Sequence, residues 1–182
     1  IHTINERVDR LRSWMKENGF TAFVFPSSDP HNSEYVADHW KSREWISGFS
    51  GSAGTAVVTL EHDALWTDSR YFIAAEKELN GTGFQLMKLR VEGTPSVSEW
   101  LASELSTYEK AVVGLDGNVN SFAEVAAMEQ ELATKGNITV RTDADPMAEL
   151  WTDRPVIPDN MVSLHPLEYS GESTSSKVSR VR

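Results

Sequence analysis

The stretch from Gly48 to Val58 places three glycines at intervals of three residues directly before a β-branched run. Glycine-rich loops hold phosphate when they leave a strand and open a helix, because the helix N-terminus then binds the anion. Here the order is reversed: a helical turn precedes the glycines and a strand follows them. Gly54 is followed by Thr55 and Ala56, so the lysine of a P-loop is missing as well. The sequence therefore disfavours nucleotide binding and predicts a close-packed turn that enters a core strand.

A second stretch, DPHNSEYVADH, gathers oxygen and nitrogen groups of the kinds that bind zinc or manganese. They are Asp29, His31, Glu34, Asp38 and His39. A metal site needs three or four such groups to converge, but no H-E-x-x-H motif fixes the two histidines on one helix face. Ser, Asp, Asn and Pro also favour turns and helix caps. A solvated, turn-forming loop is therefore the simpler interpretation, and a set of metal ligands is the alternative.

The stretch WTDSRYF places Asp68, Ser69 and Arg70 where an expected strand gives way to an expected helix. Side chains at such junctions lie at the C-terminal edge of the sheet, where α/β proteins commonly build their sites. The simpler interpretation is an N-cap at Asp68 or Ser69 with an arginine in the first helical turn. The functional interpretation is an Arg70–carboxylate or Arg70–peptide contact.

The composition of the 182 residues narrows the function classes further. A net charge of −10 opposes binding to nucleic acid and to anionic membranes. The absence of cysteine excludes disulfide scaffolds, thiolate zinc sites and a cysteine nucleophile, and no G-x-S-x-G motif supports a serine nucleophile. No apolar run reaches the ~18 residues of a membrane span. We therefore expect a soluble globular protein of the cytoplasm.

Hydrophobic periodicity and capping signals indicate the elements that must position these groups. Capping boxes at Thr3/Glu6 and at Ser121/Glu124 mark two helix starts. Pro95 is expected in the first turn of another helix. A tight turn across EHD joins two strands into a hairpin. We expect helices over residues 3–19, 69–81, 94–105 and 121–136, a helical turn over 42–46, and strands over 21–26, 55–60, 64–68, 84–89, 111–116 and 138–142.

This alternation of helices and strands predicts an α/β fold with a mixed β-sheet flanked by helices, because the hairpin adds an antiparallel pair to an otherwise parallel sheet. Residues 1–158 are expected to form one domain. Residues 159–182 are expected to be a linker and the truncated start of a second domain, since KVSRVR begins a helical pattern that has no room to bury its apolar face.

Several long stretches, in a fixed order, carry a resemblance to a known family. PSSDPHNSEYVADHWKSREWISGFSGSAGTAVVT, ALWTDSRYFIAAEKEL, FQLMKL and ELWTDRP resemble the N-terminal domain of cytosolic aminopeptidase P (Xaa-Pro aminopeptidase), within the creatinase/prolidase group. The resemblance covers nearly the whole chain and implies a ribonuclease H-like topology. It also implies that the whole protein removes the N-terminal residue from peptides with proline second. In this family the chemistry belongs to two divalent metal ions, typically manganese, in a C-terminal pita-bread domain that is absent from this chain.

For this chain the resemblance implies a non-catalytic domain that contributes to dimerisation and to the active-site entrance. It places no catalytic residue and no metal ligand here, and it predicts that the fragment alone is inactive. Peptides and a second copy of the protein are the implied partners, without nucleic acid or membrane. The residues that match family motifs and could face the entrance are His31, Glu34, Asp68 and Arg70. The alternative is a stand-alone creatinase-like module that binds peptides or supports assembly without peptidase activity.

Overall fold

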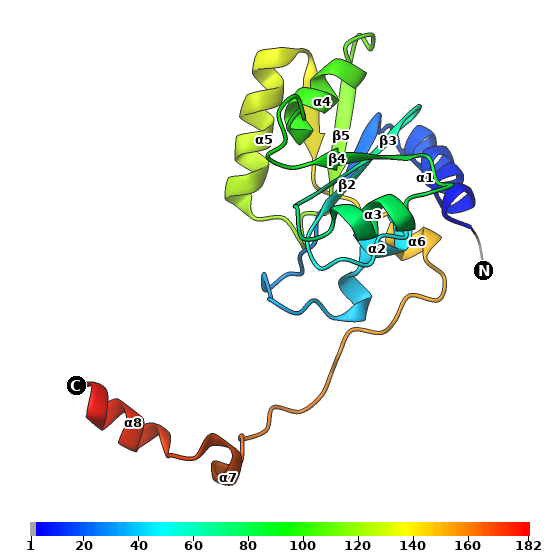
Figure 1. The fold of residues 1–182 in the computed structure, drawn as a ribbon. Coiled ribbons are helices and arrows are strands. Elements are labelled where there is room, and N and C mark those ends of the chain that lie inside the picture. The colour runs from blue at the N-terminus through cyan, green and yellow to red at the C-terminus, as the bar shows by residue number, and fades with distance from the viewer. Residues whose placement is uncertain (1–2) are drawn as a thin grey trace.

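A computed structural model describes residues 3–182, and six strands of these residues form one mixed sheet (Figure 1). The order across the sheet is β4-β3-β2-β1-β5-β6. β2 runs antiparallel to both β1 and β3, and the other three neighbouring pairs are parallel. The predicted α/β fold and its hairpin are therefore confirmed. The strands are β1 (Ala22–Phe25), β2 (Thr55–Thr59), β3 (Asp63–Thr67), β4 (Phe84–Lys88), β5 (Ala111–Leu115) and β6 (Ile138–Arg141).

Helices cover both faces of this sheet (Figure 1). β1 shows how the two-residue period of a strand builds two cores, since Phe23 and Phe25 pack on one face and Ala22 and Val24 on the other. All four are buried, as expected for a strand covered on both sides. One face carries α1 (Ile4–Asn18), α2 (Ser42–Ser47), α3 (Phe72–Glu78) and α6 (Met147–Leu150), and the other carries α4 (Val97–Glu104) and α5 (Phe122–Lys135).

Capping boxes define the helix starts. Both predicted ones are present, at the first turns of α1 and α5. A third starts α4, where the Ser96 hydroxyl accepts from the Glu99 backbone N–H (3.1 Å) and the Glu99 carboxylate accepts from the Ser96 backbone N–H (2.9 Å). Pro95 therefore precedes the cap, and the prediction that it lies in the first helical turn is wrong.

The helix predicted over residues 69–81 is shorter than expected. α3 begins only at Phe72, and neither Asp68 nor Ser69 caps it. The Asp68 carboxylate accepts instead from the backbone N–H of Arg70 (3.1 Å) and from its guanidinium. The Tyr71 N–H donates to the Asp68 carbonyl (3.0 Å), so the chain makes one turn before the helix starts.

After α6 the chain leaves the sheet and its helices. Residues 152–166 contain no helix or strand, and two short helices follow, α7 (Leu167–Ser170) and α8 (Thr174–Val181), which lie apart from the body in Figure 1. α8 confirms the helical pattern expected from KVSRVR. Nothing in the described part of the chain is both helical and apolar over the length that a membrane crossing requires. Large apolar side chains along this tail are exposed, among them Val156, Met161, Val162, Leu164 and Val181.

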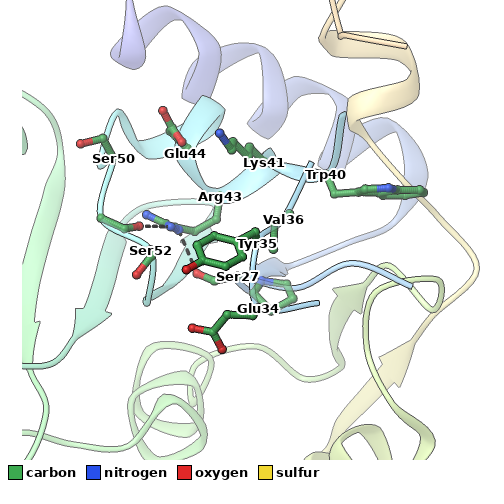
Figure 2. A pocket seen from close by; sticks show the side chains of 12 residues that line it. Ser27, Glu34, Tyr35, Val36, Trp40, Lys41, Arg43, Glu44, Ser50 and Ser52 are labelled. Atoms are coloured by element: carbon green, nitrogen blue, oxygen red, sulfur yellow. Dashed lines mark hydrogen bonds between the residues drawn. The ribbon is translucent and has the colours of Figure 1, made fainter. Parts of the chain in front are cut away.

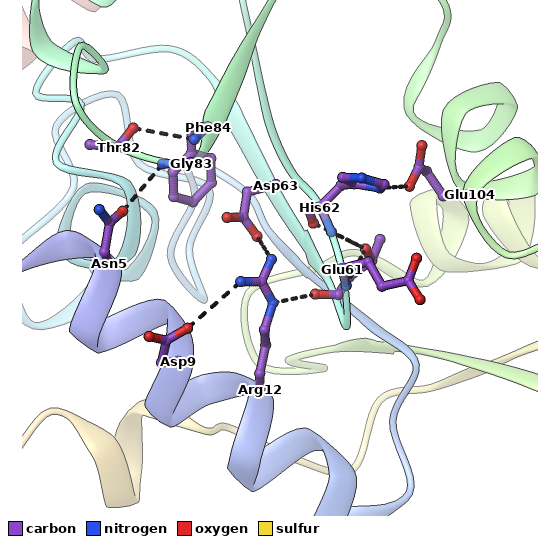
Figure 3. A network of polar contacts seen from close by, with 11 residues as sticks. Asn5, Asp9, Arg12, Glu61, His62, Asp63, Thr82, Gly83, Phe84 and Glu104 are labelled. Atoms are coloured by element: carbon purple, nitrogen blue, oxygen red, sulfur yellow. Dashed lines mark hydrogen bonds and ion pairs between the residues drawn. The ribbon is translucent and has the colours of Figure 1, made fainter.

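A buried ion pair ties α1 to the start of β3 (Figure 3). Arg12 Nη2 lies 2.6 Å from Asp63 Oδ1, and Arg12 Nε donates to the Thr59 carbonyl (3.0 Å). Asp63 is only 4% exposed. Burial raises the pKa of the Asp63 carboxyl to about 6, against the opposing influence of the Arg12 charge.

Asp63→Asn is expected to remove a pH dependence of folding. Because the pKa of Asp63 is about 6 in the folded chain and about 3.9 in an unfolded one, the folded state binds this proton more tightly. The stabilisation is full below about pH 4 and is lost as the pH rises through 6, a change of at most about 3 kcal/mol. Urea unfolding should be measured from about pH 4 to pH 7. The difference in free energy of unfolding between the wild type and the variant should fall as the pH rises. A constant difference would contradict the assignment.

Candidate functional site

The C-terminal ends of β1 and β3 lie at the same edge of the sheet as the start of β2, because β2 runs antiparallel to both. The glycine segment (residues 48–54) and the polar loop (residues 26–41) adjoin this edge in the chain. Two cavities of about 210 and 310 Å³ open there, and both have Pro26, Ser27 and Ser52 in their walls. Figure 2 shows the smaller one. The edge is therefore hollowed where α/β proteins commonly place their sites.

The glycine segment is closely packed, as the sequence predicts. Gly48 ends α2 with a positive φ of 76°. A Cβ on Gly51 would lie 2.3 Å from a ring carbon of Phe49, and one on Gly54 would lie 2.9 Å from the Trp66 carbonyl oxygen. At these two positions only the absence of a side chain allows the backbone to approach so closely.

Arg43, which no sequence motif indicated, binds the glycine segment through hydrogen bonds. It is only 6% exposed, and its Nη1 donates to the Phe49 carbonyl (2.7 Å), its Nε to the Ser27 hydroxyl (3.1 Å) and its Nη2 to the Gly51 carbonyl. The guanidinium also lies 4.9 Å from the centre of the Phe49 ring. Burial lowers its pKa from the ordinary arginine value. One signal could have revealed it: Arg43 shares a helix face with the buried Ile46, three residues away.

Two amides of the glycine segment are already occupied, which argues against a phosphate site. The Ser50 N–H donates to the Glu78 carboxylate (2.9 Å), and the Gly54 N–H donates to the Ser27 hydroxyl (3.0 Å). The Ser50 hydroxyl donates to the same carboxylate (2.7 Å). A negative charge thus lies where a phosphate would have to bind, so the segment does not have the chemistry of an anion cradle.

Asp68 and Arg70 form a two-pronged ion pair at this edge. Arg70 Nε lies 2.8 Å from Asp68 Oδ1, and Arg70 Nη2 lies 2.9 Å from Asp68 Oδ2. The Arg70 hydrogen bonds lower the pKa of Asp68 to about 2, and the pKa of Arg70 is raised above its ordinary value, mainly by Asp68 and more weakly by Tyr71 and Glu34. Arg70 is exposed, with its guanidinium 5.1 Å from the centre of the Tyr71 ring. The structure thus brings Asp68 and Arg70 into contact, with Glu34 within electrostatic range.

Asp68 lines the larger cavity and Glu34 the smaller one, whereas Arg70 and His31 line neither. Arg70 joins the group through its contact with Asp68, and His31 stands apart from it. Its backbone N–H and that of Ser33 donate to the buried Asp29 carboxylate, both at 2.9 Å, which lowers the pKa of Asp29. Asp29 is therefore a turn-forming residue, as the simpler interpretation held. His39 Nδ1 lies 2.7 Å from the Pro155 carbonyl oxygen. Among residues 3–182, no three His, Asp or Glu side chains gather in a way that could hold a metal ion.

Comparison with known proteins identifies the family. The creatinase/prolidase N-terminal domain matches residues 7–149. Xaa-Pro aminopeptidase 1 of Dictyostelium discoideum is 37% identical over 98% of this chain, and a probable Xaa-Pro aminopeptidase P of Aspergillus oryzae is 39% identical over 100% of it. The chain spans only 29% and 28% of the length of these relatives.

Solved structures agree with this likeness. The chain superposes over its full length on X-prolyl aminopeptidase from Caenorhabditis elegans, with a TM-score of 0.83 and 31% identity, and spans 31% of that enzyme. The worm protein is described as a cytosolic enzyme with a di-nuclear active site. The N-terminal domain of the cytoplasmic peptidase PepQ from Mycobacterium tuberculosis shares the fold, with a TM-score of 0.59 at 22% identity over 80% of this chain. The chain belongs to the creatinase/prolidase N-terminal domain family, in the form carried by Xaa-Pro aminopeptidases.

Proposed function

We propose that this chain is the non-catalytic N-terminal domain of a metal-dependent Xaa-Pro aminopeptidase. In the whole protein it contributes to dimerisation and, through Glu34, Asp68, Arg70 and His31, to the active-site entrance. The observation that carries the proposal is the match of nearly the entire chain to less than a third of each Xaa-Pro aminopeptidase relative. We further propose that residues 1–158 form this domain and residues 159–182 a linker and the start of a second one. The protein works in the cytoplasm, as the worm enzyme does.

The metal chemistry is assigned to the remainder of the protein. The donor groups of residues 3–182 do not fit a di-nuclear centre, because no three of them converge and two bridged ions need a larger convergent set. Two divalent ions, with manganese as the proposed metal, would therefore be held by residues outside this chain. Peptides with proline at the second position are the proposed substrates.

Arg70→Ala in the whole protein is expected to lower kcat/KM for a Xaa-Pro peptide on the order of tenfold. Arg70 is exposed, and its Nη1, which the ion pair with Asp68 does not use, can donate to a peptide carbonyl or carboxylate. The fold should be unaffected, because no buried contact is lost. Steady-state kinetics and the thermal unfolding midpoint would be measured on the same preparation.

Arg141→Ala provides the matched control. Arg141 makes a similar two-pronged contact, with Nε and Nη2 each 3.0 Å from the oxygens of Asp143. It also donates to the Asn18 carbonyl and lies over the Phe20 ring, so it serves as the control for kcat/KM and not for stability. It lies on β6, the edge strand farthest from β4. Its removal should leave kcat/KM unchanged. If Arg70→Ala also leaves kcat/KM unchanged, the entrance assignment is wrong.

The 182-residue chain by itself is expected to show no cleavage of Xaa-Pro peptides with added manganese, whereas the whole protein should cleave them. The alternative, a stand-alone module that binds peptides or supports assembly, predicts that the whole protein is inactive too. Assaying both forms on the same peptide separates the two functions. Light scattering of the whole protein, with and without residues 1–158, tests the dimerisation role.

A further inference from the structure

The smaller cavity, shown in Figure 2, contains an unusual charge. Arg43 lies in its wall, yet this residue is only 6% exposed to solvent. A buried guanidinium normally has a carboxylate partner, because desolvating an unpaired charge costs several kcal/mol. Within residues 3–182, no ion pair involves Arg43. Glu44 and Glu78 attract the guanidinium from a distance but do not offset its burial, since burial lowers the pKa of Arg43 despite them. The cavity wall therefore holds a desolvated cation with no counter-charge in direct contact.

The neutral partners of Arg43 do not use all its donors. A guanidinium has five N–H groups, and the hydrogen bonds to Ser27, Phe49 and Gly51 account for three. Those acceptors are a hydroxyl and two carbonyls, which accept hydrogen bonds but carry no net charge. A carboxylate entering the cavity would supply both the missing acceptor and the missing charge.

The same cavity carries two carboxylates whose charges act on neighbouring cations only at longer range, Glu34 on Arg70 and Glu44 on Arg43 and Lys41. Glu34 and Glu44 line it, and neither carboxylate forms a hydrogen bond or ion pair with residues 3–182; Figure 2 shows them on different sides of Arg43. Lys41, also in the wall, is already paired with Asp38 at 2.6 Å. The cavity thus presents one cation and two anions that form no ion pair in contact within the described chain, which suits a ligand that carries both signs.

Size and wall chemistry limit that ligand further. The cavity holds about 210 Å³, several times the ~30 Å³ that a water occupies in the liquid but less than the ~300 Å³ at which drug-sized pockets begin. Tyr35, which is 91% exposed, and Trp40 supply aromatic surface at its mouth. We propose that this cavity binds a small zwitterion, an amino acid or dipeptide, whose carboxylate meets Arg43 and whose ammonium group meets Glu34 or Glu44. The proposal depends on the cavity alone and does not require the peptidase role.

Titration of the 182-residue chain with alanylalanine, followed by backbone amide NMR shifts, tests this directly. The C-terminal amide of the same dipeptide lacks the carboxylate, and its binding is expected to be weaker by tenfold or more, since a charge-assisted hydrogen bond is lost. The N-acetyl derivative lacks the ammonium group and should bind several-fold more weakly. Saturable shifts should map to the cavity wall, including Ser52 and Trp40.

Variants separate the two ends of the ligand without disturbing the fold. In Glu34→Gln/Glu44→Gln, the penalty for N-acetylation should disappear while the penalty for amidation remains. Glu109→Gln, an exposed carboxylate at the opposite end of the sheet, should behave like the wild type. Equal affinity for all three ligands, an absence of saturable binding, or shifts confined to other surfaces would each overturn the proposal, whatever the peptidase assays show.

Discussion

Arg43→Met is expected to lower the free energy of unfolding by about 3 kcal/mol. Methionine keeps much of the side-chain length but donates no hydrogen bond, so the carbonyls of Phe49 and Gly51 lose their Arg43 donor in a largely buried place, while the Ser27 hydroxyl keeps its bonds to Gly54. Each such group costs about 1–3 kcal/mol, and removing a desolvated charge recovers part of the sum. Urea unfolding followed by circular dichroism measures the change.

Two further variants show whether the geometry of Arg43 is responsible. Arg43→Lys keeps the charge, but lysine lacks the planar fork that reaches three acceptors. Its free energy of unfolding should therefore lie between those of the wild type and Arg43→Met. Arg70→Met removes an exposed guanidinium from the same edge of the sheet and should leave the urea midpoint unchanged. An unchanged midpoint in Arg43→Met would show that the glycine segment does not depend on this residue.

Gly51→Ala is expected to destabilise the fold by about 2–3 kcal/mol, the range of overpacking in a well-filled core. The added Cβ would lie 2.3 Å from a Phe49 ring carbon. The ring cannot easily move, because it is fully buried between the Arg43 guanidinium and the Tyr71 ring, whose centres lie 4.9 and 5.8 Å from its own. The thermal unfolding midpoint should fall by several degrees.

The matched control is Gly136→Ala. Gly136 has an extended φ of 171°, and the nearest atom to its added Cβ would be 3.8 Å away. Alanine there should be neutral or slightly stabilising, since it restricts the unfolded chain without strain. If both alanine variants unfold at the wild-type temperature, the close packing of the glycine segment has no energetic weight.

Local signals in the sequence predicted the elements well. A capping box needs only residues three apart, so the starts of α1 and α5 followed directly from Thr3/Glu6 and Ser121/Glu124. The predicted start of α3 was wrong because of another local contact. Asp68 had a competing partner, the Arg70 side chain, and bound it instead of a helix amide.

The candidate site was only partly predictable. The glycine spacing and the strand after it indicated a close-packed turn, and the structure confirms one. Arg43 could not be predicted, because its acceptors come from Ser27, before α2, and from Phe49, after α2. Only the folded chain brings them together. The contact of Asp68 with Arg70 joins residues only two apart, whereas the separation of His31 from the cavities depends on how the polar loop folds.

The position of β1 in the sheet exposes the chain to aggregation while it is being synthesised. Phe23 pairs with Val58 on one side but with Gly114 on the other, so one side of β1 has no partner until β5 leaves the ribosome. Until then, β1 to β4 can assemble as a sheet whose outer strand is the apolar segment AFVF. Such an edge recruits strands from other chains. A polypeptide that ends before Ala111 would therefore aggregate through this strand. The nascent protein would benefit from a chaperone that covers β1 until β5 pairs with it.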